Sequence, residues 1–581
     1  MADLRWENFD PDAFDRARRE NRPILLVLTK PWCTVCRALL DGPFRSDEVL
    51  QVARDRFVPI RVDAERRPDV NERYGLGEWP TVAYLTPDGE LLKQHGRLEA
   101  AELQAELQSV ADYFAGNQGE IEERLQSLWA SQEAGEEIRR QRQGELNKQI
   151  IEDIRQALYS GFDHKYGGWG DKEKFPHPEA IDFALILFQK QNDPQMREVA
   201  QLTLDKTIEG AVHDSIDGGF FRYSKTPDWR RPNFEKLLDS NALKLRNLLE
   251  AGQIFDQPHY HSAARGIVSW MTGRMMDPDS GAFFGSQDAD PDYYLGDRAA
   301  REDREPPHID KTIYTDSNAI TISALLKAAV VLDQPELRTV AHRALDFLLR
   351  ELVDESQGVF HYWDGTYHLP GLLSDQAYLI RALIDMAQHT GNSDLLLPAE
   401  RIAEQAIARQ RAPGGGFFDI LHDPSNRGSM KRRNRSILEN SVMAESLLRL
   451  SSLARRPEFH DEAVSTLAAF TGDYREYGHF VAAYGRAVDL LFYEPLMITV
   501  VGDRETEEAD ALRRTALQPY VPSRIVQMLD PKHDPILLER AKFEVEDAPV
   551  AYLELGREIR ATARSERELL EAIAGLEEAR R

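Results

Sequence analysis

The chain has 581 residues, more than one hydrophobic core usually supports, so we expect several folded units. Its net charge of −26 excludes a general nucleic-acid binder, because phosphate binding needs a positive surface. No stretch approaches the roughly 18 apolar residues of a membrane span, and the first ten residues lack the basic and apolar parts of a signal peptide, so we expect a cytoplasmic protein with no membrane partner.

Residues 1–115 are predicted to form an α/β domain of thioredoxin type. RPILLVLTK (22–30) and FVPIRVDA (57–64) are apolar runs typical of buried strands. TVAYLTPDGELL (81–92) is predicted to be a hairpin and AAELQAELQSVADYF (100–114) a closing helix. This order of strands and helices is that of a thioredoxin-like sandwich.

Cys33 and Cys36 are the only cysteines in the chain, and they lie between the first strand and the helix that follows it. A thiol at a helix N-terminus lies at the positive end of the helix dipole, which favours the thiolate that attacks disulfides. We therefore expect an exposed Cys33 to attack a substrate and Cys36 to resolve the mixed disulfide. Trp32 would cover the site, and Pro80 would face the thiols after a cis peptide bond.

The cysteine pair has two other interpretations: part of a metal site, or a pair that takes no part in chemistry. A zinc site would need two more ligands, and no second CxxC or histidine pair lies nearby in the sequence, so we expect no metal and no cofactor. An inert pair on a scaffold domain is the remaining alternative.

Residues 116–150 are predicted to be a helical linker, and residues 151–495 an all-α toroid. The second region is mostly helical and is interrupted by six glycine–aromatic marks spaced roughly 50 to 80 residues apart. One such turn after every pair of helices indicates a closed ring of six hairpins, an (α/α)6 toroid. The marks are GGW (167–169), GGFF (218–221), GAFF (281–284), GVF (358–360), GGGFF (414–418) and GHF (478–480).

Residues 496–581 are predicted to form a small α/β subdomain. LMITVVGD (496–503) and SRIVQMLD (523–530) are strand-like, and a hairpin is expected around LGRE (555–558). No glycine-rich phosphate-binding motif accompanies these strands. We therefore expect this subdomain to pack against the toroid rather than to bind a nucleotide.

Five motifs, in this order along the chain, resemble the spermatogenesis-associated thioredoxin-like family. They are VDAERRPDVNERYG (62–75), KFPHP (174–178), GGFFRYS (218–224), NFEKLLDSN (233–241) and SQDAD (286–290). This family joins an N-terminal thioredoxin-like domain (DUF255) to a six-hairpin toroid related to glycosidases and N-acylglucosamine 2-epimerases. The resemblance covers nearly the whole chain.

The chain departs from the family at several chemically important positions. The family's WCHxM motif is replaced by WCTVC, so that Cys36 completes a CxxC pair that relatives often lack. Asn233 and Ser240 stand where the family has a histidine and an aspartate, and an acidic insert (298–308) replaces an aromatic stretch. The loss of these groups weakens the prediction of sugar chemistry in the toroid.

The resemblance implies that a carbohydrate would bind at the mouth of the toroid, between aromatic side chains and carboxylates. The predicted substrate-binding residues are Arg222, Tyr223, Trp229, Glu235, Asp288, Asp290, Asp316 and Asp375. An epimerase would need paired bases, and the candidate histidines, none with a convincing partner spacing, are His164, His177, His361 and His368. The alternative is that the acids cap helices and pair with basic residues.

Three functions are compatible with these patterns. We favour a thiol–disulfide oxidoreductase that acts on a disulfide-containing protein or a small thiol, with the toroid recognising the substrate. The second is a carbohydrate-active enzyme, either a glycoside hydrolase or a sugar epimerase, with an accessory thioredoxin-like domain. The third is a non-enzymatic binding scaffold.

Overall fold

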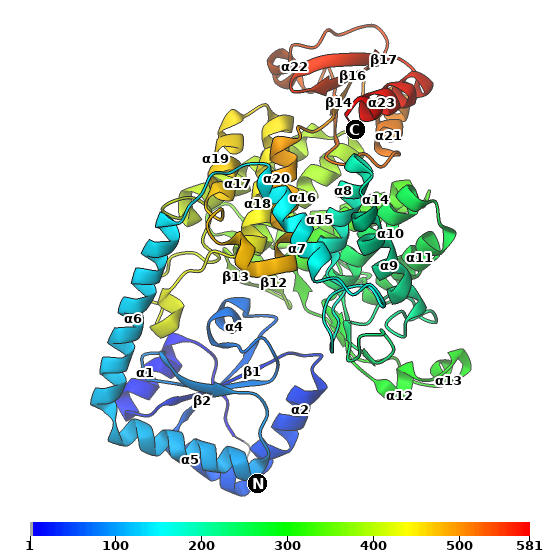
Figure 1. The fold of residues 1–581 in the computed structure, drawn as a ribbon. Coiled ribbons are helices and arrows are strands. Elements are labelled where there is room, and N and C mark those ends of the chain that lie inside the picture. The colour runs from blue at the N-terminus through cyan, green and yellow to red at the C-terminus, as the bar shows by residue number, and fades with distance from the viewer. Residues whose placement is uncertain (1–3, 581) are drawn as a thin grey trace. The chain divides into compact units, whose positions relative to one another are not determined.

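The computed structural model describes residues 4–580 and comprises two compact units (Figure 1). One unit contains the chain up to Gln141 together with Asp419–Asn434, and the other contains Arg142–Phe418 and the chain from Arg435 onwards. Within the described residues, no helix combines the length and the apolar character needed to cross a membrane.

A four-stranded sheet forms the centre of the first unit. Strand β1 is parallel to β2 and antiparallel to β3, which pairs antiparallel with β4, so the order is β2-β1-β3-β4. All six residues of β1 are buried, as its apolar sequence predicts. The strands are β1 (Ile24–Thr29), β2 (Val58–Asp63), β3 (Thr81–Leu85) and β4 (Leu91–His95).

Helices cover both faces of this sheet (Figure 1). Leu25 and Val27 pack with α2, α3 and α5 on one face, and Leu26 and Leu28 pack with α1 and α4 on the other. The predicted α/β sandwich of thioredoxin type is therefore confirmed. The helices of this unit are α1 (Pro11–Glu20), α2 (Thr34–Asp41), α3 (Asp47–Arg56), α4 (Pro68–Tyr74), α5 (Ala100–Gly116) and α6 (Gln118–Gln141).

A stretch much later in the chain, Asp419–Asn434, belongs to this first unit. The buried guanidinium of Arg73 donates to Asp419 Oδ2 at 2.9 Å and to the carbonyl of Arg432 at 2.8 Å. The N–H of Ser429 donates to the carbonyl of Gly89 at 3.2 Å. The sequence pattern placed this stretch in the toroid; it leaves the ring because the buried arginine takes its acceptors from it.

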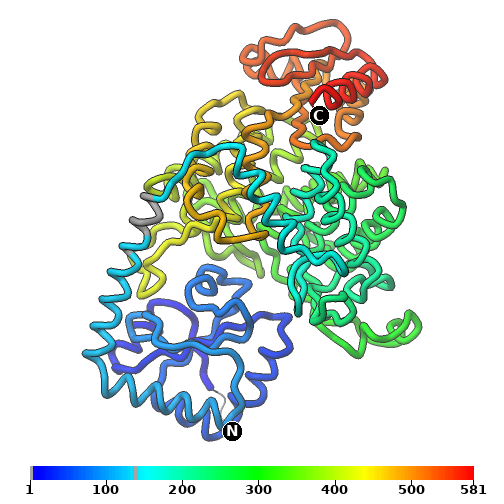
Figure 2. Tube along the Cα trace, viewed as in Figure 1, coloured from blue at the N-terminus to red at the C-terminus, as the bar shows by residue number. Residues whose placement is uncertain are grey.

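The second unit contains a ring of six inner helices, each covered by an outer helix (Figures 1 and 2). The inner helices contact one another in the closed order α8, α10, α14, α16, α18, α20 and back to α8. Helix α7 packs against α20, so the first and last helices of the region close the ring. The predicted (α/α)6 toroid is confirmed.

The inner helices share a direction, and all begin at the end of the ring that carries the glycine–aromatic loops. They are α8 (Pro178–Gln191), α10 (Leu238–Phe255), α14 (Thr315–Val331), α16 (Leu373–Thr390), α18 (Ile437–Ala454) and α20 (Ala482–Phe492). The outer helices are α7 (Gln149–Ser160), α9 (Pro194–Glu209), α11 (Pro258–Trp270), α15 (Glu336–Glu351), α17 (Leu396–Gln410) and α19 (Pro457–Ala468).

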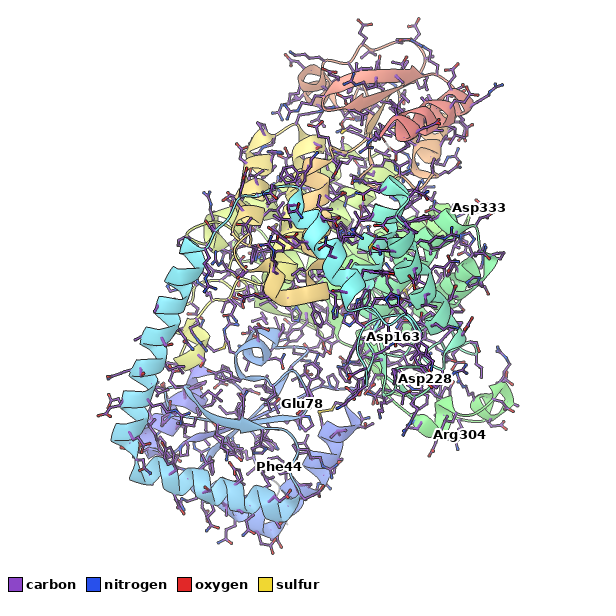
Figure 3. The ribbon with its side chains drawn as sticks, viewed as in Figure 1. Phe44, Glu78, Asp163, Asp228, Arg304 and Asp333 are labelled. Carbon is purple, nitrogen blue, oxygen red and sulfur yellow. A yellow bond between two sulfur atoms is a disulfide. The ribbon has the colours of Figure 1, made fainter. Side chains whose placement is uncertain are left out.

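The six glycine–aromatic marks lie between each outer helix and the next inner helix. In three of them, an asparagine in the first turn of the inner helix accepts from the N–H of the aromatic residue; these are Asn241, Asn318 and Asn440. At Gly218, where φ is +83°, a Cβ would lie 2.0 Å from the carbonyl oxygen of Gly266. Lys174 fixes the first mark by donating to Asp163, which is labelled in Figure 3, and to the carbonyl of Gly167.

The C-terminal subdomain contains a second four-stranded sheet in the order β15-β14-β16-β17. As in the first unit, the first strand is parallel to the second and antiparallel to the third, and the third pairs antiparallel with the fourth. Its elements are β14 (Met497–Val501), α21 (Glu507–Leu517), β15 (Ile525–Leu529), α22 (Pro535–Ala541), β16 (Val550–Leu555), β17 (Glu558–Ala563) and α23 (Glu566–Arg580).

The predicted α/β subdomain is thus a second copy of the thioredoxin topology. The third strand of each copy contains the sequence VAYL, at 82–85 and at 550–553; Pro549 directly precedes the second VAYL, and Pro80 lies two residues before the first. Cys33 precedes the first residue of α2, and Thr506 precedes the first residue of α21 in the same way. The second copy therefore has Thr506 and Ala509 where the first has its two thiols.

Candidate active sites

The two cysteines form a disulfide at the start of α2. Cys33 caps the helix, because the N–H of Cys36 donates to its Sγ at 3.1 Å. This Sγ lies 3.7 Å from the carbonyl oxygen of Trp79, and the Trp79–Pro80 peptide bond is cis, as predicted. The structure therefore brings together Cys33, Cys36 and Pro80, which the sequence pattern had selected.

Exposure differs from the prediction at this site. Cys33 is 5% exposed and Cys36 1%, so the expectation of an exposed first thiol is wrong for this disulfide form. Trp32, expected to cover the site, is buried itself: its indole N–H donates to Glu65 at 2.8 Å and its ring lies edge-on to Trp79. The exposed residues next to the disulfide are Thr34 and Val35.

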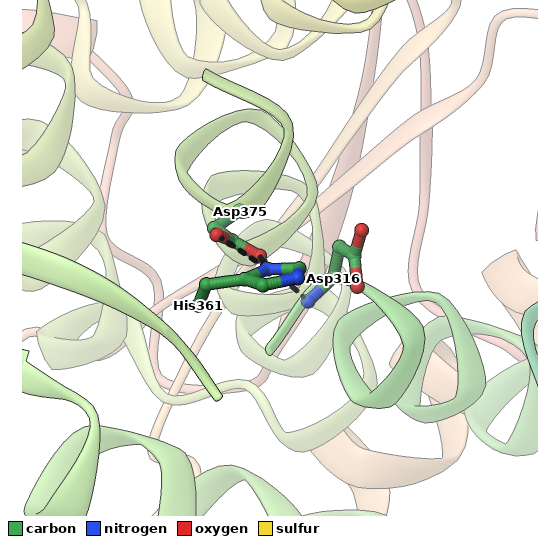
Figure 4. A group of neighbouring side chains, drawn as sticks. All are labelled: Asp316, His361 and Asp375. Atoms are coloured by element: carbon green, nitrogen blue, oxygen red, sulfur yellow. Dashed lines mark hydrogen bonds and ion pairs between the residues drawn. The ribbon is translucent and has the colours of Figure 1, made fainter. Parts of the chain in front are cut away.

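The ring brings two predicted acids and one histidine together at the start of its inner helices (Figure 4). Asp316 lies in the first turn of α14 and Asp375 in the first turn of α16. His361, in the strand β12 (Gly358–Trp363), is placed with Nδ1 3.0 Å from Asp375 Oδ2. Asp375 Oδ1 also accepts from the backbone N–H of Asp316 at 3.1 Å.

The two carboxylates have different electrostatic surroundings. Burial, together with the nearby charge of Asp375, raises the pKa of Asp316 to about 6, although His361 opposes the rise. Asp375 instead faces the imidazole and the Asp316 N–H. Asp316 can therefore hold a proton up to about pH 6, and Asp375 lies beside it as a hydrogen-bond acceptor.

The same three residues have the chemistry of a metal site. Asp316, His361 and Asp375 each offer one ligand atom, and these atoms all lie within 4.8 Å of one another. Carboxylate oxygens and a neutral imidazole suit a divalent ion such as Zn²⁺ or Mn²⁺. The cluster could therefore hold a cation, whereas the prediction of no metal considered ligands only around the cysteine pair.

Three other predicted residues form a second group at the same end of the ring. The N–H of Arg222 donates to the carbonyl of Glu235 at 2.8 Å, and its guanidinium lies over the rings of Phe175 and Tyr223. Phe175 and Tyr223 stack with their centroids 4.7 Å apart. Burial raises the pKa of Glu235, whose Oε1 accepts from Asn233 at 2.8 Å.

Three other residues that were predicted to bind substrate make contacts within the protein instead. Trp229 is 1% exposed and donates to the carbonyl of Tyr166, so the prediction that it contacts a ligand is wrong. Asp290 caps the short helix α12 (Pro291–Tyr294) by accepting from the N–H of Tyr293. Asp288 is buried, with its carboxylate 3.9 Å from His308.

The acidic insert folds onto the ring rather than hanging free. Arg301 lies in the helix α13 (Arg298–Glu302) and pairs with Asp214 and Asp217 at 2.9 Å each. Tyr293 also donates to Asp217. The insert therefore covers the loop that precedes α10.

Several residues of this end of the ring were not selected from the sequence. Asp239 occupies in α10 the place of Asp316 in α14; a repeated DSN at the two helix starts (239–241 and 316–318) was the available signal. Glu179 lies in the first turn of α8, and burial raises its pKa.

The predicted histidines have different surroundings from one another. His361 pairs with Asp375, so the statement that no histidine has a suitable partner is wrong. Burial and the nearby His479 lower the pKa of His177 to about 3. His164 pairs with Glu198, and His368 with Asp364, at exposed positions.

Comparison with known proteins covers both units. A family model described as "Protein of unknown function, DUF255", with a thioredoxin label, matches residues 2–133. Spermatogenesis-associated protein 20 from Rattus norvegicus is 23% identical over 94% of this chain and 86% of its own length, and the Homo sapiens protein is 23% identical over 94% and 87%. The chain is related to the spermatogenesis-associated thioredoxin-like family. The resemblance inferred from the five motifs is confirmed.

Solved structures are similar to the ring region of this chain. The cellobiose 2-epimerase of Spirochaeta thermophila covers 59% of this chain and 98% of its own, with 14% identity and a TM-score of 0.47. A glycoside hydrolase family 76 mannosidase of Bacteroides thetaiotaomicron covers 59% and 98%, with 12% identity and a TM-score of 0.45.

Proposed function

We propose that the first unit is a thiol–disulfide oxidoreductase and that the ring recognises its substrate. The observation that carries the proposal is the Cys33–Cys36 disulfide at the start of α2, beside the cis Pro80. The helix N-terminus and the Cys36 N–H both stabilise negative charge on the sulfur of Cys33. This is the arrangement that an attacking thiol needs.

The exchange proceeds in two balanced steps. A substrate thiolate attacks Cys33 Sγ, the bond between Cys33 and Cys36 breaks, and Cys36 leaves as a thiolate. A second substrate thiolate then attacks the substrate sulfur of the mixed disulfide, and Cys33 leaves. Two electrons pass from the substrate dithiol to the protein, and a reduced pair runs the same steps in reverse on a disulfide.

Trapping of a mixed disulfide tests this proposal on the full chain. The reduced Cys36→Ser variant, mixed with oxidised glutathione, should gain one glutathione on Cys33, detected by intact-protein mass spectrometry. Cys33→Ser is the matched control and should gain none, because its remaining thiol is buried in the first turn of α2. Equal labelling of the two variants would refute the assignment of roles. So would the absence of labelling in both variants together with a wild type that reduces no disulfide.

A second function is favoured by the carboxylates of the ring. Asp316 can keep a proton near pH 6 and give it to a leaving oxygen, while Asp375, oriented by His361, can accept a proton from water or from a sugar. Stacked Phe175 and Tyr223 offer a surface for a sugar ring. These groups support acid–base chemistry on a carbohydrate.

A sugar screen on paired variants tests the second function. Wild type would be incubated with a panel of disaccharides, and hydrolysis and epimerisation would be followed by NMR. Asp375→Asn should lower any turnover at least about 100-fold, the scale of general acid–base catalysis, whereas exposed Asp461→Asn should leave it unchanged. Turnover that survives Asp375→Asn, or an inactive wild type, would exclude this site.

A further inference from the structure

A cavity of about 180 Å³ lies inside the ring, at the end opposite the acid cluster. It is lined by the middle and C-terminal parts of the inner helices and is bordered by the segment Tyr520–Ile525 of the C-terminal subdomain. Neither candidate active site contributes a side chain to it. The space equals about six waters at their share of liquid volume.

The charged side chains of this cavity do not balance. Six cationic side chains line it: Arg246, Lys327, Arg381, Arg449, Arg486 and Arg524. Four carboxylates line it: Asp182, Glu250, Asp385 and Glu445. Six minus four leaves two formal positive charges. His389 adds none, because burial lowers its pKa to about 3.

The ion pairs among these groups show which side chain carries excess positive charge. Each carboxylate has a cationic partner; Glu250, for example, is 2.7 Å from Lys327 and 3.1 Å from Arg246. Arg524 instead donates to the carbonyls of Leu517 and Pro519. Its electrostatic partner, Glu577, lies outside the cavity lining and is itself paired with Arg580 at 2.8 Å.

The cavity also contains acceptors that no described residue satisfies. Asp182 Oδ1 and Glu250 Oε2 are buried and accept from no N–H or hydroxyl donor within residues 4–580, and the two carboxyl groups hydrogen-bond to each other only when one of them carries a proton. Buried charge without a counter-charge, and buried acceptors without donors, are both costly in a folded protein. A ligand that carries negative charge and hydroxyl groups would satisfy both needs.

We propose that this cavity binds a small phosphorylated polyol. Its dianionic phosphate neutralises the two excess positive charges, and its hydroxyl groups donate to Asp182 and Glu250. The rival explanation is that the negative ends of the inner helix dipoles, which lie at this end of the ring, offset the excess without a ligand. Only the proposed ligand site, and not the dipole explanation, requires the cavity to bind an anion.

Equilibrium dialysis of the full chain against glycerol 3-phosphate tests the proposal, with inorganic phosphate, glycerol and chloride as comparison probes at equal ionic strength. We expect one saturable site per chain that prefers glycerol 3-phosphate to phosphate and ignores glycerol and chloride. Arg524→Gln should weaken binding about 10-fold or more, the scale of one charge-assisted hydrogen bond. Asp385→Asn should tighten binding, since it removes a carboxylate partner of Arg449.

Exposed Arg350→Gln is the matched control and should bind as wild type does. If Arg524→Gln fails to fold, the wild-type isotherm and Asp385→Asn still decide the matter. Absence of saturable binding to wild type overturns the proposal, as does a site that chloride fills equally well, or one that neither cavity variant alters.

Discussion

Asp316 should make the protein less stable as the pH rises from about 4 to about 6. Its pKa is about 6 in the folded chain, against 3.8 for an unperturbed aspartate. The folded state therefore binds this proton more tightly than the unfolded chain, and the free energy of unfolding falls as the pH rises through that window. A difference of about two pH units, at about 1.4 kcal/mol each, corresponds to about 3 kcal/mol.

Asp316→Asn removes this titration. At pH 7 the variant should gain up to about 3 kcal/mol relative to wild type, and at pH 4 the two should nearly coincide. Urea unfolding of both proteins at half-unit steps from pH 4 to pH 7 measures the difference, in which the other titrating groups cancel. Asp461→Asn, at an exposed acid, should stay within about 0.5 kcal/mol of wild type throughout. A pH-independent difference, or a loss of stability at pH 7, would refute the reasoning.

Three further substitutions test the packing. Arg73→Met leaves the carboxylate of Asp419 buried without its cation and should cost about 3–5 kcal/mol, seen as faster proteolysis within 419–434 than in wild type. Asn318→Leu removes the acceptor and donor that hold a glycine–aromatic loop and should cost about 2–3 kcal/mol by urea unfolding, with exposed Asn8→Leu as the neutral comparison. Gly218→Ala forces a Cβ against a backbone carbonyl and should lower Tm by several degrees; an unchanged Tm would contradict the close approach.

The thiol site could be predicted from sequence because its parts are local. The two cysteines are three residues apart, and the strand before them and the helix after them have clear apolar patterns. The ring could be predicted because its turns repeat. Both predictions depend on short spacing or on periodicity, which a single sequence displays directly.

The acid cluster of the ring could be predicted only in part. Asp316 and Asp375 are 59 residues apart, and His361 reaches Asp375 from a strand whose pairing the sequence does not show. Tertiary closure of the ring, rather than local pattern, brings them together. Trp229 was misassigned for the opposite reason: close approaches at Gly168 and Gly210 form a slot that buries it, and no local pattern reveals the slot.

Because the sheet topology is repeated, a thioredoxin fold with two cysteines and one without them can be compared within a single chain. The C-terminal copy has the strand pairings of the first copy, but Thr506 and Ala509 stand where the thiols would be. If a binding activity requires residues 497–580 but is unchanged when both cysteines are replaced, that activity belongs to the thioredoxin fold and does not depend on thiol chemistry. In this chain the second copy supplies Tyr520–Ile525, which forms part of a cavity wall.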